Sequence, residues 1–459
     1  METQNHQQTE TKSEKPNVMI VGAGLGGLLL GILLERAGIP YHIYERATKL
    51  RALGSALTLG ANILPVFEQL GLLPALEEIS LPVPSLDIYK SDMKLFGSIK
   101  LMGRKGTGYE NLLFERPRLY ELLLKHVPSE KITQGKKVIR AEEKESDKVV
   151  IHCEDGSTFE GDILVGADGA YSKIRQDLFN RMGEEGTPVP KEDLEDMVLG
   201  DICMVGVAKP SHPEKYPQLK SNISHFMCVL GKDRKSWHAV SVPNNHICWS
   251  LIVQLTEAEV KEQKFRNTEW TPESNEAMIK DFYDLPSPMG GTMGELIDET
   301  PKDLISRVFL EEKIFKTWFH GRTVLLGDAC HKMLPGAGQG AVNAMQDATV
   351  LANCIYNMAG RSQESVIAGF EEYYRQRYPH ALQKFNVSKE WSMVMFGQTW
   401  IERMVRHIMV KYTPEWLFMR THTKNFAHRP QIAWLPLAET RGMLPALPQE
   451  GVRKLLHEN

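Results

Sequence analysis

Cysteine is scarce and scattered in this sequence of 459 residues. No two cysteines form a C-x-x-C pair, so their spacing predicts neither a zinc site nor a disulfide framework. Long runs of Lys and Arg are also lacking, and the net charge of −4 gives no other reason to expect a nucleic-acid partner. Reduced, mostly buried thiols are expected at Cys153, Cys203, Cys228, Cys248, Cys330 and Cys354.

The first sixteen residues lack the apolar core that a secretory signal peptide or a membrane span needs. Their polar composition predicts a disordered tail, and a cytoplasmic location is the expectation that follows. Over the whole chain, 42% hydrophobic and 24% charged residues are ordinary for a soluble globular protein. The length predicts roughly two to three structural units with sizeable cores.

The stretch from residue 18 to residue 46 predicts a strand, a tight turn, a helix and a second strand. An apolar strand at residues 18–21 is followed by glycines with G-x-G-x-x-G spacing at Gly22, Gly24 and Gly27. Gly22 permits the turn, Gly24 lets the backbone approach a pyrophosphate, and Gly27 lets the helix pack closely on the strand. The helix, expected over about residues 28–37, offers its N-terminus to that pyrophosphate.

The second strand of this unit ends on an acidic residue. Glu45, with Arg46 next to it, lies at the usual distance for accepting hydrogen bonds from a ribose. Its negative charge disfavours a ribose 2′-phosphate at this site. The stretch therefore predicts binding of either FAD or NAD, and the motif alone does not choose between them.

Two further motifs follow predicted buried strands. Gly327-Asp328 comes after the strand at 323–326, and the glycines of "PGAGQG" then open a helix from about Ala341. A second helix N-terminus at the same sheet edge would stabilise negative charge on a flavin ring. The other motif, "GADGAYSKIR", places Asp168 after the strand "DILV". Taken alone, Asp328 also fits a loop acid or a helix N-cap, and Asp168 also fits the cap of a turn at the end of its strand.

In this order and at these separations, the three motifs resemble those of single-component (class A) FAD-dependent monooxygenases, the 4-hydroxybenzoate hydroxylase type. The resemblance covers roughly residues 18–378, and the overall sequence pattern is most like that of fungal hydroxylases and epoxidases. It implies an α/β fold: a Rossmann-like FAD-binding domain of the glutathione-reductase type, an inserted, mainly antiparallel β-sheet domain for the substrate, and a helical C-terminal region.

The resemblance also implies which segments build each part. Residues 1–16 would be the tail, 17–85, 105–180 and 302–378 the FAD-binding domain, 86–104 and 181–301 the substrate domain, and 379–459 the helical region. The residues assigned to FAD in this way are Gly22, Gly24, Gly27, Glu45, Arg46, Thr58, Arg116, Asp168, Gly327, Asp328, Pro335, Gly340, Ala341 and Val342.

Several of these positions carry a distinct role in the family. By resemblance, Arg116 of "ERPRL" would contact the flavin-side phosphate, and Asp328 would bind a ribityl hydroxyl. Pro335 and Gly340 would line the isoalloxazine, and the N–H groups of Ala341 and Val342 would lie near its N1 and C2 carbonyl. Asp168 would serve both FAD packing and the use of NAD(P)H.

The chemistry implied by the resemblance belongs mostly to the cofactor. NADPH or NADH would reduce the flavin, dioxygen would add to form the C4a-hydroperoxide, and one oxygen atom would hydroxylate or epoxidise a small molecule. Many such hydroxylases carry an arginine before a glycine where this chain has Val205-Gly206, which favours a neutral or apolar aromatic, indole or isoprenoid substrate. Either lining the chamber or core packing is open to Met204, Met227, Trp237 and Trp249.

Other readings stay open. A non-hydroxylating FAD oxidoreductase of the same fold or an NAD-dependent dehydrogenase would share the first fingerprint. His331 beside Cys330 suggests a catalytic pair or a metal ligand, but a packed histidine behind the flavin loop is favoured. Residues 391–412 are apolar at helical spacing but too charged for a span; docking on the FAD-binding domain is the main expectation, and association with a membrane surface the minor one.

Overall fold

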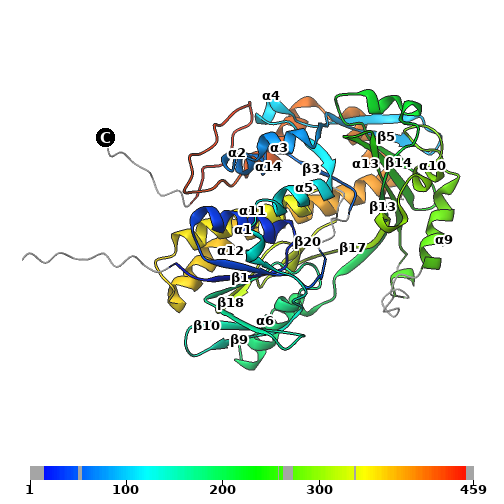
Figure 1. Ribbon diagram of the computed structural model, residues 1–459. Coiled ribbons are helices and arrows are strands. Elements are labelled where there is room, and N and C mark those ends of the chain that lie inside the picture. Colours follow the sequence, from blue (N-terminus) through cyan, green and yellow to red (C-terminus); the bar gives the residue numbers. More distant parts are fainter. Residues whose placement is uncertain are drawn as a thin grey trace, which may run out of the picture.

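The computed structural model describes residues 15–49, 54–256, 258–261, 272–334, 338–397 and 399–450. Two large sheets dominate these residues (Figure 1). Pro335 and residues 1–14 of the expected tail lie outside them. All six cysteines are buried and free, as the sequence predicts.

The first sheet has six strands and holds the core of the predicted nucleotide-binding unit. Its strands are mostly parallel, and most of their side chains are apolar and buried, because helices and a smaller sheet cover both faces. Only β18 runs antiparallel to its neighbour. The order is β18 (Phe319–His320), β19 (Thr323–Leu325), β12 (Ile163–Gly166), β1 (Val18–Val21), β2 (Tyr41–Tyr44) and β8 (Ile132–Thr133).

Helices α1 (Leu25–Ala37) and α11 (Gly340–Asn357) pack side by side against this sheet (Figure 1). Helix α1 begins three residues earlier than the sequence predicts and ends at Gly38, whose left-handed backbone conformation terminates it. On the other face lie α6 (Lys173–Glu184) and the small antiparallel sheet of β9 (Val138–Lys144), β10 (Lys148–Cys153) and β11 (Thr158–Gly161).

A three-stranded sheet and short helices join this unit to the rest of the chain. The strands are β3 (Ala56–Leu59), β7 (Leu112–Glu115) and β4 (Leu81–Pro82), and β7 leads directly into α5 (Arg116–Leu124). The short helices are α2 (Leu64–Gln69), α3 (Leu73–Glu78), α4 (Arg104–Thr107) and α7 (Lys191–Leu194).

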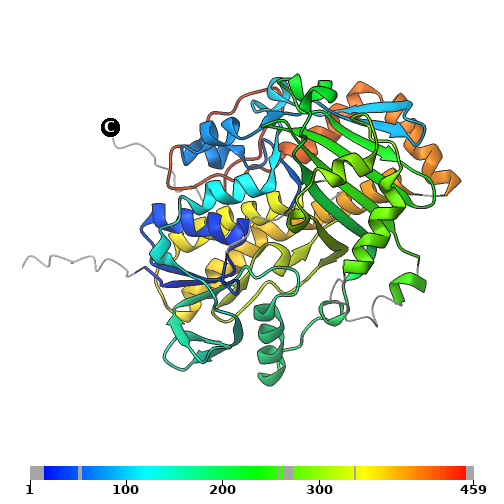
Figure 2. The same cartoon turned by 45° about the vertical axis from the view of Figure 1, so that its right-hand side comes forward.

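The second large sheet has eight strands and is antiparallel except where β14 pairs with β5, which confirms the predicted inserted sheet. Figure 2 shows α9 (Pro272–Tyr283) and α10 (Met293–Asp298) against its outer face. The order is β20 (His331–Lys332), β17 (Ser306–Ile314), β13 (Val198–Ala208), β16 (His246–Gln254), β15 (Lys235–Val242), β14 (Phe226–Leu230), β5 (Ser85–Lys90) and β6 (Leu95–Lys100).

One strand differs from the predicted division of the chain. Residues 302–378 were assigned to the FAD-binding part, but β17 hydrogen-bonds along β13 in the eight-stranded sheet. The physical reason is that pairing with a strand about a hundred residues away decides where β17 belongs, and local pattern does not reveal that partner.

The C-terminal region is helical and then irregular. Helix α12 (Gln363–Phe396) runs without a break through residue 378, where the sequence placed a boundary. It is followed by α13 (Trp400–Tyr412) and α14 (Glu415–Ala427). The chain then returns over α11 and α2, where Asn353 and Gln69 bond to the backbone of residues 431–433. No helix among the described residues has both the length and the apolar character to cross a membrane.

Candidate cofactor site

The three predicted motifs meet at one edge of the six-stranded sheet. Strands β1, β12 and β19 are adjacent and parallel, so the residues that follow their carboxyl ends lie next to one another. These are Gly22 after β1, Asp168 after β12 and Asp328 after β19. Ligands of open α/β sheets bind at this edge, so the fold places the motifs where a nucleotide would lie.

The glycines of the first motif face different surroundings. Gly22 has φ +109°, and a Cβ there would lie 2.4 Å from the carbonyl oxygen of Ala167. A Cβ on Gly27 would lie 2.1 Å from the carbonyl oxygen of Gly22. A Cβ on Gly24, in contrast, meets no described protein atom within 4 Å. Gly22 and Gly27 are therefore required by the packing of the chain itself, whereas the space beside Gly24 fits the expected pyrophosphate.

Glu45 is held in place at the same edge. Its two carboxylate oxygens accept hydrogen bonds from the backbone N–H groups of Ala23 and Ala47, each at 2.8 Å. A carboxylate has about four acceptor positions, so it retains capacity for ribose hydroxyls. Arg46, next to it, is exposed.

The N-termini of α1 and α11 lie together at this edge of the sheet. A Cβ on Gly26 would come within 2.7 Å of the Leu326 side chain and 3.2 Å of the Ala344 carbonyl oxygen. Gly26 therefore allows the close approach of the two helices. The first turn of α11 contains Gly340, Ala341 and Val342, and neither helix has a side-chain N-cap. Both N-termini thus present backbone N–H groups and positive dipole ends.

Arg116 and Asp328 approach each other across the site. Strand β3 pairs with β7, which brings Thr58 opposite Leu113 and the N–H of Arg116 to the Ser55 carbonyl at 2.8 Å. Burial lowers the pKa of Arg116, and the charge of Asp328 acts in the opposite direction. Asp328 also accepts a hydrogen bond from Lys332 at 2.7 Å. A cation and a carboxylate therefore flank the sheet edge at which the three motifs meet, which we call the cofactor edge.

Asp168 caps α6 in this structure. Its carboxylate accepts hydrogen bonds from the Ser172 hydroxyl at 2.5 Å and from the Lys173 N–H at 2.7 Å. Burial raises its pKa, and these hydrogen bonds offset part of that effect. The geometry matches the capping alternative, which does not exclude a second role toward a cofactor.

Arg175 joins two of the motifs, a role that no local pattern in the sequence indicates. Its guanidinium donates hydrogen bonds to the carbonyl oxygens of Ala170 and Ala329, both at 2.8 Å, and stacks 4.0 Å from the Phe315 ring centroid. This buried side chain fixes the turn after β12 to the turn after β19. Only its place three residues after Ser172 was visible in the sequence.

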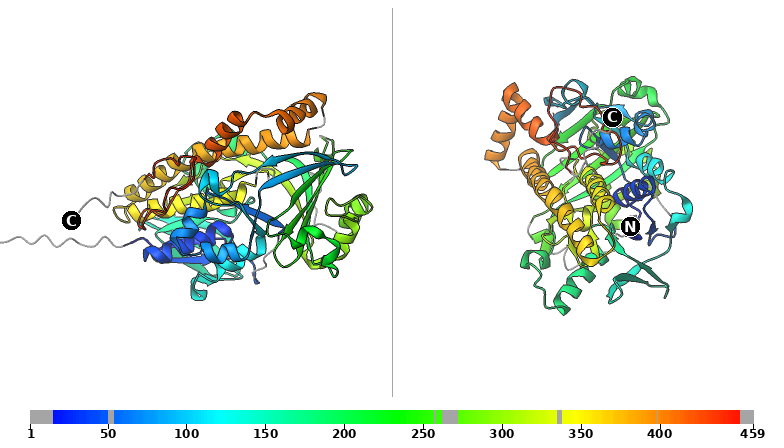
Figure 3. Two further views of the ribbon diagram at one scale, coloured as in Figure 1. Left: turned by 90° about the horizontal axis from the view of Figure 1, so that it is seen from above. Right: turned by 90° about the vertical axis from the view of Figure 1, so that its left-hand side faces the viewer.

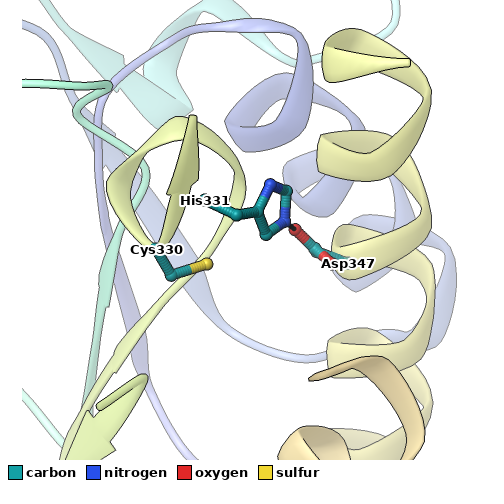
Figure 4. A group of neighbouring side chains, drawn as sticks. All are labelled: Cys330, His331 and Asp347. Carbon is teal, nitrogen blue, oxygen red and sulfur yellow. Dashed lines mark hydrogen bonds and ion pairs between the residues drawn. The ribbon is translucent and has the colours of Figure 1, made fainter. Parts of the chain in front are cut away.

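A cluster of buried ionisable side chains around Asp347 lies behind the turn that carries Asp328 (Figure 4). Asp347 of α11 accepts hydrogen bonds from His331 Nε2 at 2.6 Å, from Arg377 Nε at 2.7 Å and from the Gly327 N–H at 2.9 Å. Burial raises the pKa of Asp347, but His331 and Arg377 outweigh it and hold that pKa at about 2. His331 is fully buried, as expected for a packed histidine.

Cys330, His331 and Asp347 lie close enough together to suggest a metal site. Two features do not fit one. The Arg377 guanidinium and the Gly327 N–H already occupy the two oxygens of Asp347, and the Cys330 thiol donates to the Gly327 carbonyl oxygen at 3.4 Å. The group is therefore a structural support for the turn at Gly327.

One face of the eight-stranded sheet looks toward the cofactor edge. At one end, Val207 and Cys248 pack with Ala56 of β3, and at the other, Cys203 and Ile252 pack with Leu334, which precedes Pro335. Between these contacts a row crosses the sheet, formed by Val205, Ser250 and His238 in register. All three are half-buried.

The row carries no charge at neutral pH. His238 Nδ1 lies 2.8 Å from the Ser250 hydroxyl, and burial lowers the pKa of His238 to about 4. The carboxyl groups on this face, Asp201 and Glu312, have raised pKa values because they are buried; that of Asp201 reaches about 6.

The opposite face of the sheet is filled. The four apolar residues that the sequence left between chamber lining and core packing belong to a cluster with Phe282 of α9 and Met293 of α10. The core-packing alternative is correct for all of them. They are Met204, Met227, Trp237 and Trp249.

The chain is similar to known flavoproteins. A family model described as "FAD binding domain" matches residues 15–287 and 289–386. The FAD-dependent monooxygenase ptmM of Penicillium ochrochloron is 29% identical over 389 residues, which cover 82% of this chain and 88% of that protein. The FAD-dependent monooxygenase paxM of Penicillium paxilli is 31% identical over 349 residues, which cover 74% of this chain and 69% of that protein.

A solved structure shares the fold. HpxO of Klebsiella pneumoniae, complexed with FAD and uric acid, aligns with a TM-score of 0.72 at 19% sequence identity over 90% of this chain and 97% of that chain. The predicted combination of a Rossmann-like domain and an inserted sheet is thereby confirmed as the fold of known flavin hydroxylases.

Proposed function

The chain belongs to the FAD-binding-domain family, among its class A FAD-dependent monooxygenases, and from that premise we propose that it uses NADPH or NADH and dioxygen to hydroxylate or epoxidise a small neutral or apolar molecule. The observation that carries the substrate part is the uncharged row on the sheet face that looks toward the cofactor edge. An aromatic, indole or isoprenoid molecule fits such a surface.

The residues of the sheet edge fit FAD. Gly24 and the N-terminus of α1 would hold the pyrophosphate, Glu45 the ribose, and Arg116 with Asp328 the flavin-side phosphate and ribityl chain. Bound FAD supplies the redox chemistry, accepting reducing equivalents from NAD(P)H and activating dioxygen, one atom of which enters the substrate while the other leaves as water.

The remaining tasks fall to the chain itself. The N–H groups at the start of α11 would stabilise negative charge on the flavin ring, because the side chain of the N-cap residue Gln339 makes no capping hydrogen bond to them. Arg175 and Asp347 keep the turn after β19 in place, so Asp328 is presented in a fixed position. The apolar contacts of Leu334 with the sheet would restrict water at the reacting face.

The charges near the row disfavour an anionic substrate. Val205 stands where an anchoring arginine was expected, and the ionisable groups of β13 and β17 on this face are carboxyls, Asp201 and Glu312. A carboxylate or phenolate ligand would meet no cation in the row itself and would be repelled by Asp201 once that carboxyl ionises, whereas the Glu312 carboxyl is paired with a lysine of α12. A hydroxyl or carbonyl group, in contrast, finds hydrogen-bonding partners in Ser250 and His238.

A spectrum followed by turnover tests the proposal. The purified protein should show flavin absorbance, and NADPH oxidation should accelerate with oxygen uptake when a neutral aromatic or isoprenoid substrate is added. Labelled dioxygen should leave one labelled atom in the product. NADPH consumption that yields only peroxide or a reduced product across a broad substrate panel would favour the non-hydroxylating oxidoreductase. Absence of flavin after reconstitution, with activity toward NAD alone, would favour the dehydrogenase.

Asp328→Ala and Arg116→Ala are expected to weaken FAD binding by about tenfold to a hundredfold each, since hydrogen bonds to charged groups contribute about 1.5–3 kcal/mol. The dissociation constant from titration of the apoprotein with FAD measures this. The exposed ion pair of Lys137 and Glu154 offers matched controls, because Glu154→Ala and Lys137→Ala remove the same kinds of charge elsewhere. Unchanged FAD affinity in the first two variants would reject these contacts.

Two adjacent residues of β13 should respond differently to truncation. Val205→Ala is expected to raise the KM of the substrate by about tenfold with little change in stability, because Val205 lies on the half-buried face. Met204→Ala should instead lower the free energy of unfolding by about 2–5 kcal/mol, because Met204 is fully buried in the core of the opposite face. Steady-state kinetics measure the first effect and denaturant titration the second. Reversed effects would mean that Met204 faces the substrate and Val205 the core.

A further inference from the structure

Helix α13 presents its apolar side to solvent. Trp400, Ile401, Met404, Val405 and Ile408 recur at the three- and four-residue spacing of one helix face, and all are exposed. With Tyr412 at its end and the exposed Trp416 and Leu417 at the start of α14, they form what we call the apolar ridge. Trp400 is 73% exposed and Trp416 65%, so the ridge is not covered by the described chain.

The other side of α13 faces the protein, and it is the more polar side. Val410 packs against Gly97 of β6, where even a Cβ would clash with it. The Arg406 guanidinium donates a hydrogen bond to the Met395 carbonyl oxygen at 2.7 Å, and the His407 ring contacts Phe96. This arrangement is the reverse of an ordinary surface helix, whose apolar stripe packs on the core. Docking of the apolar side on the FAD-binding domain, the main expectation from the sequence, is therefore not what the structure shows.

The charge around the ridge is opposite in sign to that of the whole protein. Residues 400–427 contain five Lys or Arg and two Glu, although the chain as a whole carries −4. Arg403, Lys411, Arg420 and Lys424 are all exposed. A basic, amphipathic segment with Trp and Tyr on its apolar side has the composition of helices that lie in the interface of anionic membranes.

We propose that the apolar ridge docks α13 and α14 onto an anionic lipid surface. Figure 3 shows the two helices, in orange, along the outer edge of the molecule, where a flat surface can reach them. Trp400, Tyr412 and Trp416 lie at headgroup level, the position that amphipathic aromatic rings prefer. A second copy of the chain is disfavoured as the occupant, because it would bring two positively charged segments together.

Flotation with lipid vesicles tests the proposal on the full-length, FAD-loaded protein. The protein should float with vesicles of phosphatidylcholine and phosphatidylserine, and more weakly with phosphatidylcholine alone. The variant Trp400→Ser/Ile408→Ser should lose binding by about a hundredfold, because two large apolar side chains no longer insert. Lys411→Glu/Arg420→Glu should lose binding to the phosphatidylserine vesicles by about tenfold or more.

Leu194→Ser/Val198→Ser is the matched control, because both residues are exposed apolar side chains outside the ridge. It should float like the natural chain, and flavin absorbance should be the same in every variant, which separates this proposal from the proposed reaction. The proposal would be overturned if the natural chain did not float with either type of vesicle. It would also be overturned if the chain bound both types equally well. Dimerisation that the Trp400→Ser/Ile408→Ser change abolishes would also overturn it and identify a second copy as the occupant.

Discussion

Asp347→Ala is expected to lower the free energy of unfolding by about 3–5 kcal/mol, because it leaves the guanidinium of Arg377 buried without its carboxylate. The same change removes the acceptor of the Gly327 N–H, which is 2.9 Å away, so the turn that carries Asp328 should loosen. We therefore expect FAD affinity to fall together with stability. Urea titration and FAD titration of the purified variant measure the two effects.

A double-mutant cycle separates the ion pair from general damage. Asp347→Ala/Arg377→Ala should cost clearly less than the two single changes added, since it leaves no uncompensated charge. Additive costs would mean that the pair is not coupled and would contradict the role assigned to it.

The stability contributed by Asp347 should depend on pH in acid only. Its pKa is held at about 2 in the folded chain against an ordinary value of 3.8, so the unfolded chain binds the proton first. The contribution is complete above the ordinary value and is lost as the pH falls toward 2. The difference in stability between the natural chain and Asp347→Asn should shrink over that window. A difference that stays constant with pH would show that charge is not the cause.

Gly24→Ala is expected to fold with unchanged stability yet bind FAD about tenfold to a hundredfold more weakly. Its Cβ meets no described protein atom within 4 Å, and its φ of −75° suits alanine, so the new methyl group would intrude only on a pyrophosphate bound there as proposed. FAD titration of the apoprotein, with the denaturation midpoint of the apoprotein alongside, gives both quantities.

Gly27→Ala is the matched comparison at the same motif. Its Cβ would lie 2.1 Å from the Gly22 carbonyl oxygen, so the chain itself must shift and stability should fall even without cofactor. Equal loss of stability in the two variants would mean that Gly24 is also confined by protein. Undiminished FAD affinity in Gly24→Ala would place the pyrophosphate elsewhere.

The sequence predicts the cofactor edge well because its signals are local. Each motif follows an apolar strand directly, and parallel strands bring their carboxyl ends to one edge, so adjacency in space follows from the fold class. Gly22, Asp168 and Asp328 are consequently found where the pattern indicates. Their individual contacts with FAD stay predictions.

The contacts that hold the edge together were not predictable in this way. The bonds of Arg175 to Ala329 and of Asp347 to Arg377 join positions far apart in the chain, and nothing local marks the partner. The sequence also does not distinguish the two faces of β13. The strand is apolar on both sides, so the alternation of its side chains does not show which face packs on the core. Val205 and Met204 received opposite surroundings only through the packing of other elements.

The order of the strands in the six-stranded sheet has a consequence for synthesis on the ribosome. Strand β1 can pair with β2 soon after both emerge, but its other neighbour is β12, and β19 joins later still, at Thr323–Leu325. The turn with Gly22 and Gly24 therefore exists long before the turn with Asp328 and the start of α11. Chains released before residue 323 would expose an unfinished sheet edge, which invites aggregation. Capture of the flavin at the complete site must therefore follow the synthesis of α11.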